Sequence, residues 1–188
     1  MNAHWKLRLG VVCLLSTMSS PARSNLSPDG SALRQLARET VATAELKPGA
    51  KTTNGINTTG RVLHLPGGSD SYPAFWVRDA AMMLGGGLIA AEEIEGWIIL
   101  IAAVQPGAEG IRLQHGLSVP GYSIPDHINV NGRVVWYPGT YADGDDQGKG
   151  QYGFLPPADD AFYFIQMVRE CADLTGSTDF LNRRLPTG

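Results

Sequence analysis

Residues 75–84 read Phe-Trp-Val-Arg-Asp-Ala-Ala-Met-Met-Leu. An aromatic ring, a guanidinium and a carboxylate stand together here, directly before a run of small and apolar residues. Such a run predicts a short helix that begins at Ala80. We expect Asp79 to be its N-cap, because an Asp side chain accepts a hydrogen bond from a free backbone N–H in the first turn.

The side chains of this stretch suit two different roles. A sugar-binding site needs a flat ring for the C–H face of the sugar and charged hydrogen bonds for its hydroxyls, and Trp76, Arg78 and Asp79 supply both. The alternative is that Asp79 only caps the helix while Arg78 makes a surface ion pair. Trp136 is a further candidate for stacking on sugar, with packing inside a hairpin as its alternative.

Hydrophobic spacing around this stretch predicts further helices over 31–46, 92–104 and 157–176, with Gly176 closing the last one. The helices at 80–84 and 92–104 are expected to form an αα-hairpin. A short strand is predicted over 61–65. A β-hairpin is predicted where 127–130 and 133–137 flank Asn131-Gly132. The helix over 92–104 is expected to pack with Ile94, Trp97, Ile98 and Ile101. The inward side chains of the last helix are expected to be Phe162, Ile165, Val168 and Cys171, with Asp159 and Asp160 in its first turn, where the helix dipole favours acidic side chains.

The segment Trp76-x-Arg78-Asp79 resembles the Trp-x-Arg-Asp segment of six-hairpin (α/α)6-toroid glycosidases, the glucoamylases and their relatives in particular. A second likeness covers 156–162 and 175–181, which resemble a later inner helix and the turn that ends it. The resemblance implies an all-α fold: residues 25–188 would be the N-terminal portion of a toroid built of helical hairpins, with a small β-hairpin insertion. In that family the Arg and the Asp grip hydroxyls of the sugar in the cleaved subsite.

The resemblance also bears on catalysis. Glycosidases use a carboxylic acid together with a carboxylate that acts as base or nucleophile. In the glucoamylase-like relatives these residues lie well downstream, so the resemblance implies that both fall beyond residue 188 and that this chain alone has no turnover. Asp143, Asp145 and Asp146 are the alternative candidates, because like charges in one loop raise a pKa; solvated turn residues or a calcium loop are the competing interpretations.

Metal and cofactor chemistry is not expected. His115, Asp126 and His127 lack the paired spacing of a zinc site, which favours ordinary loop or core residues. The run 148–153 matches G-x-G-x-x-G, but it neither follows a strand nor opens a helix, so it does not indicate a dinucleotide.

The resemblance implies a glycoside hydrolase that cleaves an oligo- or polysaccharide. Two alternatives stay open. One is a polysaccharide lyase or unsaturated-uronide hydrolase on the same scaffold, and the other is a non-catalytic glycan-binding protein.

The N-terminus predicts export. Lys6 and Arg8 precede an apolar run, Leu9 to Met18, of about ten residues, which suits a signal peptide and is too short to span a bilayer. Small residues follow, and we expect a signal peptide over 1–24 with cleavage after Ser24, or after Ala22 as the alternative. The mature protein is then periplasmic or secreted, with no stable membrane anchor.

Composition excludes some classes of partner. The chain is 43% hydrophobic and 18% charged, with a formal net charge of -3, so no basic surplus suggests nucleic acid. Removal of the signal peptide leaves Cys171 as the single cysteine, and no internal disulfide can form.

Overall fold

The fold of this chain combines helices with several small antiparallel sheets. The computed structural model describes residues 28–113, 118–137, 140–141, 159–183 and 185, and it shows mixed α/β content. The prediction of an all-α partial toroid is therefore wrong. Stretches between the helices that lack helical spacing pair with one another as strands, because hydrogen-bonded pairing satisfies their backbone groups.

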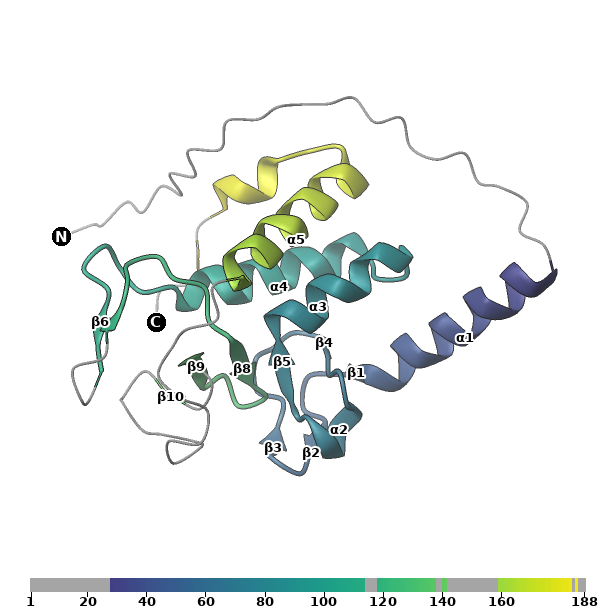
Figure 1. Cartoon of the computed structure of the whole chain (residues 1–188), viewed down its shortest axis with the longest axis horizontal. Coiled ribbons are helices and arrows are strands. Elements are labelled where there is room, and N and C mark those ends of the chain that lie inside the picture. The colour runs from purple at the N-terminus through teal and green to yellow at the C-terminus, as the bar shows by residue number, and fades with distance from the viewer. Residues whose placement is uncertain (1–27, 114–117, 138–139, 142–158, 184, 186–188) are drawn as a thin grey trace.

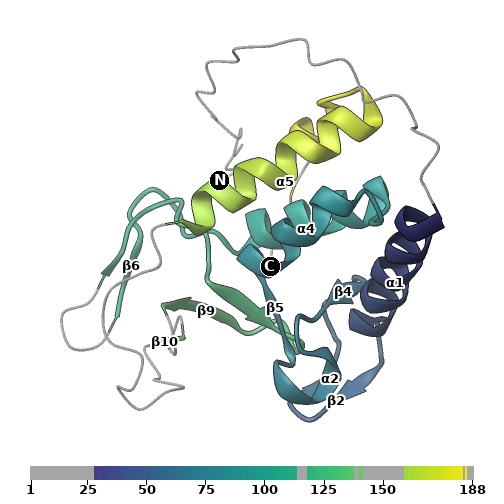
Figure 2. The same cartoon turned by 45° about the vertical axis from the view of Figure 1, so that its right-hand side comes forward.

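The helices are α1 (Pro28–Ala44), α2 (Gly68–Ser71), α3 (Val77–Met83), α4 (Ala91–Val104) and α5 (Asp160–Thr175), with 3-10 turns η1 (Leu84–Gly86) and η3 (Asp179–Asn182). Figures 1 and 2 show α3, α4 and α5 side by side. The principal helical partner of both α3 and α4 is α5, so the expected αα-hairpin of α3 with α4 is not the packing unit. Gly176 ends α5 in the left-handed conformation, as predicted.

The largest sheet has four antiparallel strands in the order β10 (Thr140–Tyr141), β9 (Val134–Tyr137), β8 (His127–Asn129) and β5 (Ala74–Trp76). Three further sheets have two strands each: β1 (Glu45–Leu46) with β4 (Leu63–His64), β2 (Lys51–Thr52) with β3 (Gly55–Ile56), and β6 (Ile111–Arg112) with β7 (Ser118–Val119).

The predicted hairpin at Asn131-Gly132 is present as β8 and β9. Its turn is closed by a 2.8 Å hydrogen bond from the Gly132 N–H to the Asn129 carbonyl. Gly132 has φ +81°, a conformation that a residue with a Cβ rarely adopts. The hairpin is not an insertion, however, because β8 also pairs with β5, which runs directly into α3. It is therefore part of the frame that positions α3.

The inward face of α4 is the predicted one, with Ile94, Trp97, Ile98 and Ile101 all buried. The predicted face of α5 is partly wrong: Phe162 is 72% exposed and Ile165 is 46% exposed. The buried side of α5 instead carries Phe164, Met167 and Cys171. Both sets fit helical spacing, so packing against α3 and α4 decides between them.

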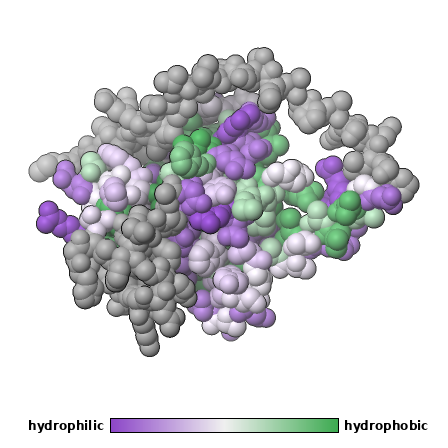
Figure 3. All heavy atoms as spheres, viewed as in Figure 1, coloured by the Kyte–Doolittle hydropathy of each residue, from purple (hydrophilic) through white to green (hydrophobic). Residues whose placement is uncertain are grey.

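The first helix, α1, projects from the body of the molecule (Figures 1 and 2). Leu33 and Leu36 are 68% and 59% exposed, and green spheres mark hydrophobic residues on this projecting end in Figure 3. Val41, near the C-terminal end of α1, packs against the core. No helix among the described residues is long and apolar enough to cross a membrane.

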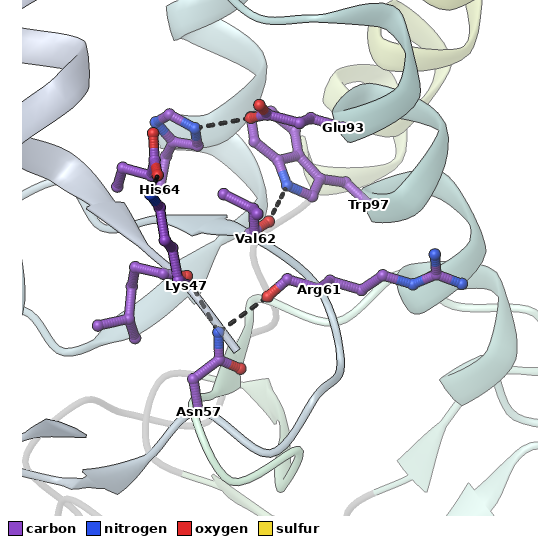
Figure 4. A network of polar contacts seen from close by, with 9 residues as sticks. Lys47, Asn57, Arg61, Val62, His64, Glu93 and Trp97 are labelled. Carbon is purple, nitrogen blue, oxygen red and sulfur yellow. Dashed lines mark hydrogen bonds and ion pairs between the residues drawn. The ribbon is translucent and has the colours of Figure 1, made fainter. Parts of the chain in front are cut away.

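A network of polar contacts joins β4 and α4 at the edge of the core (Figure 4). The His64 ring donates a 2.9 Å hydrogen bond from Nε2 to Glu93 Oε2 and meets the Trp97 ring edge-on, with 5.4 Å between centroids. The Trp97 indole N–H donates a 2.8 Å hydrogen bond to the Val62 carbonyl. We call Trp97, His64 and Glu93 the core cluster.

Candidate functional site

Trp76, Arg78 and Asp79, the candidate sugar-binding residues, line a common pocket. Trp76 closes β5, while Arg78 and Asp79 lie in the first turn of α3. The pocket has a volume of about 480 Å³. Its other walls come from the segment around α2, namely Pro66, Gly67, Ser71 and Tyr72.

Arg78 is half exposed and makes the surface ion pair that was one alternative for it. Its Nη2 donates a 2.8 Å hydrogen bond to Asp159 Oδ1, and the guanidinium carbon lies 5.9 Å from the centroid of the Tyr163 ring. Both side chains of the ion pair are more than 40% exposed, so the pair contributes little to stability. A guanidinium has five N–H donors, and this contact leaves others for a ligand.

Asp79 is not the N-cap that the sequence predicted. The helix begins at Val77, its N-cap is Trp76, and no side chain makes a cap hydrogen bond. The reason is the end of β5: the Val77 N–H bonds the Asp126 carbonyl at 3.2 Å, and the backbone turns into the helix two residues before Asp79. Within the described part of the chain the partly buried Asp79 carboxylate makes no hydrogen bond or ion pair, which leaves it free to accept from a ligand.

Trp76 contacts two other rings. It pairs with His127 across β5 and β8, and the two rings stack with 4.1 Å between centroids and 27° between planes. Tyr72 meets the indole edge-on at 6.1 Å. His127 donates a 2.7 Å hydrogen bond from Nδ1 to Asp126 Oδ2, and both residues are buried. We call Trp76, His127 and Asp126 the pocket cluster.

Asp160, in the first turn of α5, completes this region. It is only 2% exposed, and neither of its carboxyl oxygens has a hydrogen-bond partner among the described residues. The pKa of Asp160 is raised to about 8, first by burial and then by the charges of Asp126 and Asp159, while the charge of Arg78 opposes the rise. The Asp160 carboxyl is therefore mostly protonated at neutral pH.

Sequence reasoning missed the roles of Asp126, His127 and Asp160. It treated the first two as ordinary loop or core residues, and it placed Asp160 in the first turn only for its favourable charge. Asp126 and His127 reach Trp76 through the pairing of β5 with β8, which joins segments about fifty residues apart and has no local pattern. Asp160 lies in α5, and the packing of α5 on α3 and α4 has no local pattern either.

The other candidates do not join the pocket. Trp136 is 3% exposed and packs in a separate small cluster with Leu113 and Val119, so the hairpin-packing alternative describes it. Asp143, Asp145 and Asp146 lie outside the described residues, as does His115. The described residues contain no group of three His, Cys, Asp or Glu side chains that could hold a metal ion.

Comparison with known protein families, curated proteins and solved structures finds no match to this chain. The likeness to glycosidases therefore rests on the motif residues themselves.

Proposed function

We propose that this chain supplies a sugar-binding site of an exported glycoside hydrolase that acts on an oligo- or polysaccharide. The observation that carries the proposal is the shared pocket of Trp76, Arg78 and Asp79. In this proposal Trp76 stacks on the C–H face of a sugar ring, and Arg78 and Asp79 hydrogen-bond its hydroxyls.

The donor and acceptor properties of the pocket support this assignment. A sugar hydroxyl both donates and accepts, so a site that binds vicinal hydroxyls needs both functions close together. Arg78 offers only donors and the Asp79 carboxylate only acceptors, and the two are adjacent in the first turn of α3. Tyr72 and Trp76 give the same pocket two aromatic walls, which suit the apolar face of a sugar.

Hydrolysis needs an acid and a base or nucleophile in addition to this grip. Asp160 has the protonation state of an acid at neutral pH, but it is buried and does not line the pocket. Asp143, Asp145 and Asp146, which lie outside the described residues, therefore stay the candidates for the reacting carboxyl groups.

A non-catalytic glycan-binding protein is the second candidate. It is favoured by a specific observation: among the described residues that line the pocket, Asp79 is the one carboxylate. The pocket geometry required for binding is the same in both cases, so turnover decides between them.

Binding is tested with the 188-residue chain and a panel of oligosaccharides, by titration calorimetry. We expect Trp76→Phe to weaken the binding of any glycan that the wild type binds. Trp136→Phe is the matched control, because it removes the same indole from a buried cluster outside the pocket. Equal effects of the two changes, or no binding by the wild type, would show that the pocket is not a sugar site. Hydrolysis of aryl glycosides then separates the hydrolase from the binding protein.

Export is tested separately by N-terminal sequencing of secreted material. We expect the mature chain to begin at Asn25, or at Arg23 if the alternative site is used. Intact Met1 on protein recovered from the cytoplasm would contradict export.

A further inference from the structure

The orientation of the Trp76 indole in the pocket wall depends on the side chains that pack against it. The indole is partly buried, and its Nε1–H, which is buried, has no hydrogen-bond partner among the described residues. An aromatic ring without such a bond is oriented only by what it packs against. On the β8 side its neighbour is the His127 ring, stacked at 4.1 Å.

The His127 ring is itself fixed. Its Nδ1–H donates to Asp126 Oδ2 at 2.7 Å, and the ring is almost fully buried. The Asp126 backbone is tied on two sides: its carbonyl accepts from the Val77 N–H at 3.2 Å, and its N–H donates to the Val135 carbonyl at 3.0 Å. Asp126 therefore links the start of α3, where the pocket lies, to β9, and it directly precedes His127 in the chain.

We propose that His127 is a positioning residue for the pocket: it fixes the Trp76 indole from the β8 side, and Asp126 fixes the His127 ring. This inference deepens the proposed function, and its ligand-binding consequence rests on that function. The placement of Trp76 itself is measurable without any ligand, so the two can fail independently.

The test uses a change that removes the ring but keeps the hydrogen bond. In His127→Asn the side-chain amide lies near the position of Nδ1 and still donates to Asp126. The matched control is His64→Gln, in which the amide lies near the position of Nε2 and still donates to Glu93, while the ring against Trp97 is lost.

The first readout is fluorine NMR of the 188-residue chain labelled with 5-fluorotryptophan, with each signal assigned by a Trp→Phe replacement. We expect His127→Asn to shift or broaden the Trp76 signal and to leave the Trp97 and Trp136 signals in place. His64→Gln should do the reverse for Trp97. An unchanged Trp76 signal in His127→Asn would overturn the proposal.

The second readout is glycan affinity. An aromatic pair is worth enough that losing it should raise the glycan dissociation constant about three- to tenfold in His127→Asn. His64→Gln should leave that constant within about twofold of the wild type. Equal weakening by both changes would mean that the effect is a general loss of packing, which contradicts positioning. If the wild type binds no glycan, the proposed function fails while the fluorine result still decides the placement of Trp76.

A second variant covers the case in which His127→Asn does not fold. The double change Asp126→Asn with His127→Phe keeps an aromatic ring opposite Trp76 and leaves no unpaired buried carboxylate at position 126. We expect it to return the Trp76 signal and the dissociation constant to within about twofold of the wild type. A Trp76 signal that stays displaced with this ring in place would also overturn the proposal.

Discussion

Two clusters in this molecule each combine a tryptophan, a histidine and a carboxylate. One lies against the core, and the other lies beside the pocket. The core cluster sets the His64 ring against Trp97 and bonds it to Glu93 (Figure 4). The pocket cluster stacks His127 on Trp76 and bonds it to Asp126. Each is a tryptophan, a buried histidine and a carboxylate at hydrogen-bond distance.

The two clusters differ in how their tryptophans are satisfied. Trp97 is fully buried, and its N–H bonds the Val62 carbonyl. Trp76 lines a pocket, and its N–H has no partner in the described structure. Close by, Asp160 also has two buried oxygens without partners among the described residues. Unsatisfied buried groups cost stability, and the core cluster contains one as well, because His64 Nδ1 is buried without a partner in the described structure. The clusters therefore differ in their tryptophans: Trp97 is buried and hydrogen-bonded, whereas Trp76 lines a pocket.

The largest expected effect separates the tryptophans by stability. Trp97→Ala should lower the free energy of unfolding by about 4 kcal/mol, because it empties a fully buried site. Trp76→Ala should cost only about 1–2 kcal/mol, because the ring is already partly exposed. Urea unfolding followed by circular dichroism measures both. If Trp76→Ala is the more destabilising change, Trp97 is not the tryptophan on which the stability of the fold depends more.

The next effect concerns Asp160, which has no counterpart beside the core cluster. Its pKa rises from 3.8 to about 8 on folding, so the folded protein holds a proton that the unfolded chain loses near pH 4. Stability from this proton is complete below about pH 4 and is lost as the pH rises through about 8. Asp160→Asn carries no charge, so the free energy of unfolding of this variant should rise relative to that of the wild type between pH 4 and pH 8, by several kcal/mol.

Unfolding at pH 4 and pH 8 measures the Asp160 effect. Asp70→Asn is the control, because Asp70 is exposed and its change should stay within about 0.5 kcal/mol at both pH values. A pH-independent difference between Asp160→Asn and the wild type would show that Asp160 is ionised in the folded protein.

A smaller effect distinguishes binding from stability in the pocket. Arg78→Lys and Asp79→Asn should each weaken glycan binding by about 2 kcal/mol, because an ammonium cannot reproduce the guanidinium fork and an amide is a weaker acceptor than a carboxylate. Stability should change by less than about 1 kcal/mol, since the Arg78 ion pair is exposed. The control is Arg169→Lys, another exposed Arg that pairs with an Asp outside the pocket. Glycan affinity that survives both pocket changes would make these residues structural.

The smallest effect tests the hairpin that carries His127. Gly132→Ala places a Cβ at φ +81° and should lower the free energy of unfolding by about 1 kcal/mol, although no atom obstructs it. Gly85→Ala also meets open space, but its backbone is not left-handed, so it should be neutral or slightly stabilising. Thermal unfolding of the two variants measures the difference. Equal melting temperatures would mean that the turn tolerates a side chain.

Local features of the fold were open to prediction from the sequence alone. The spacing of Ile94, Trp97 and Ile101 predicted α4 and its buried face, and Gly176 marked the end of α5. Asn131-Gly132 marked the hairpin of β8 and β9. The neighbouring positions of Trp76, Arg78 and Asp79 predicted that they would act together. Each of these rests on interactions within a few residues, which a sequence pattern records directly.

The tertiary structure alone decided how distant segments meet. Pairing of β5 with β8 made the sheet part of the frame, contradicted the all-α expectation and set Trp76 opposite His127. Packing of α5 on α3 and α4 exposed Phe162 and buried Asp160, which turned an ordinary first-turn acid into a protonated one. The physical reason is that strand pairing and helix-face choice depend on the apolar surface that two segments bury together. Either segment alone leaves that choice open.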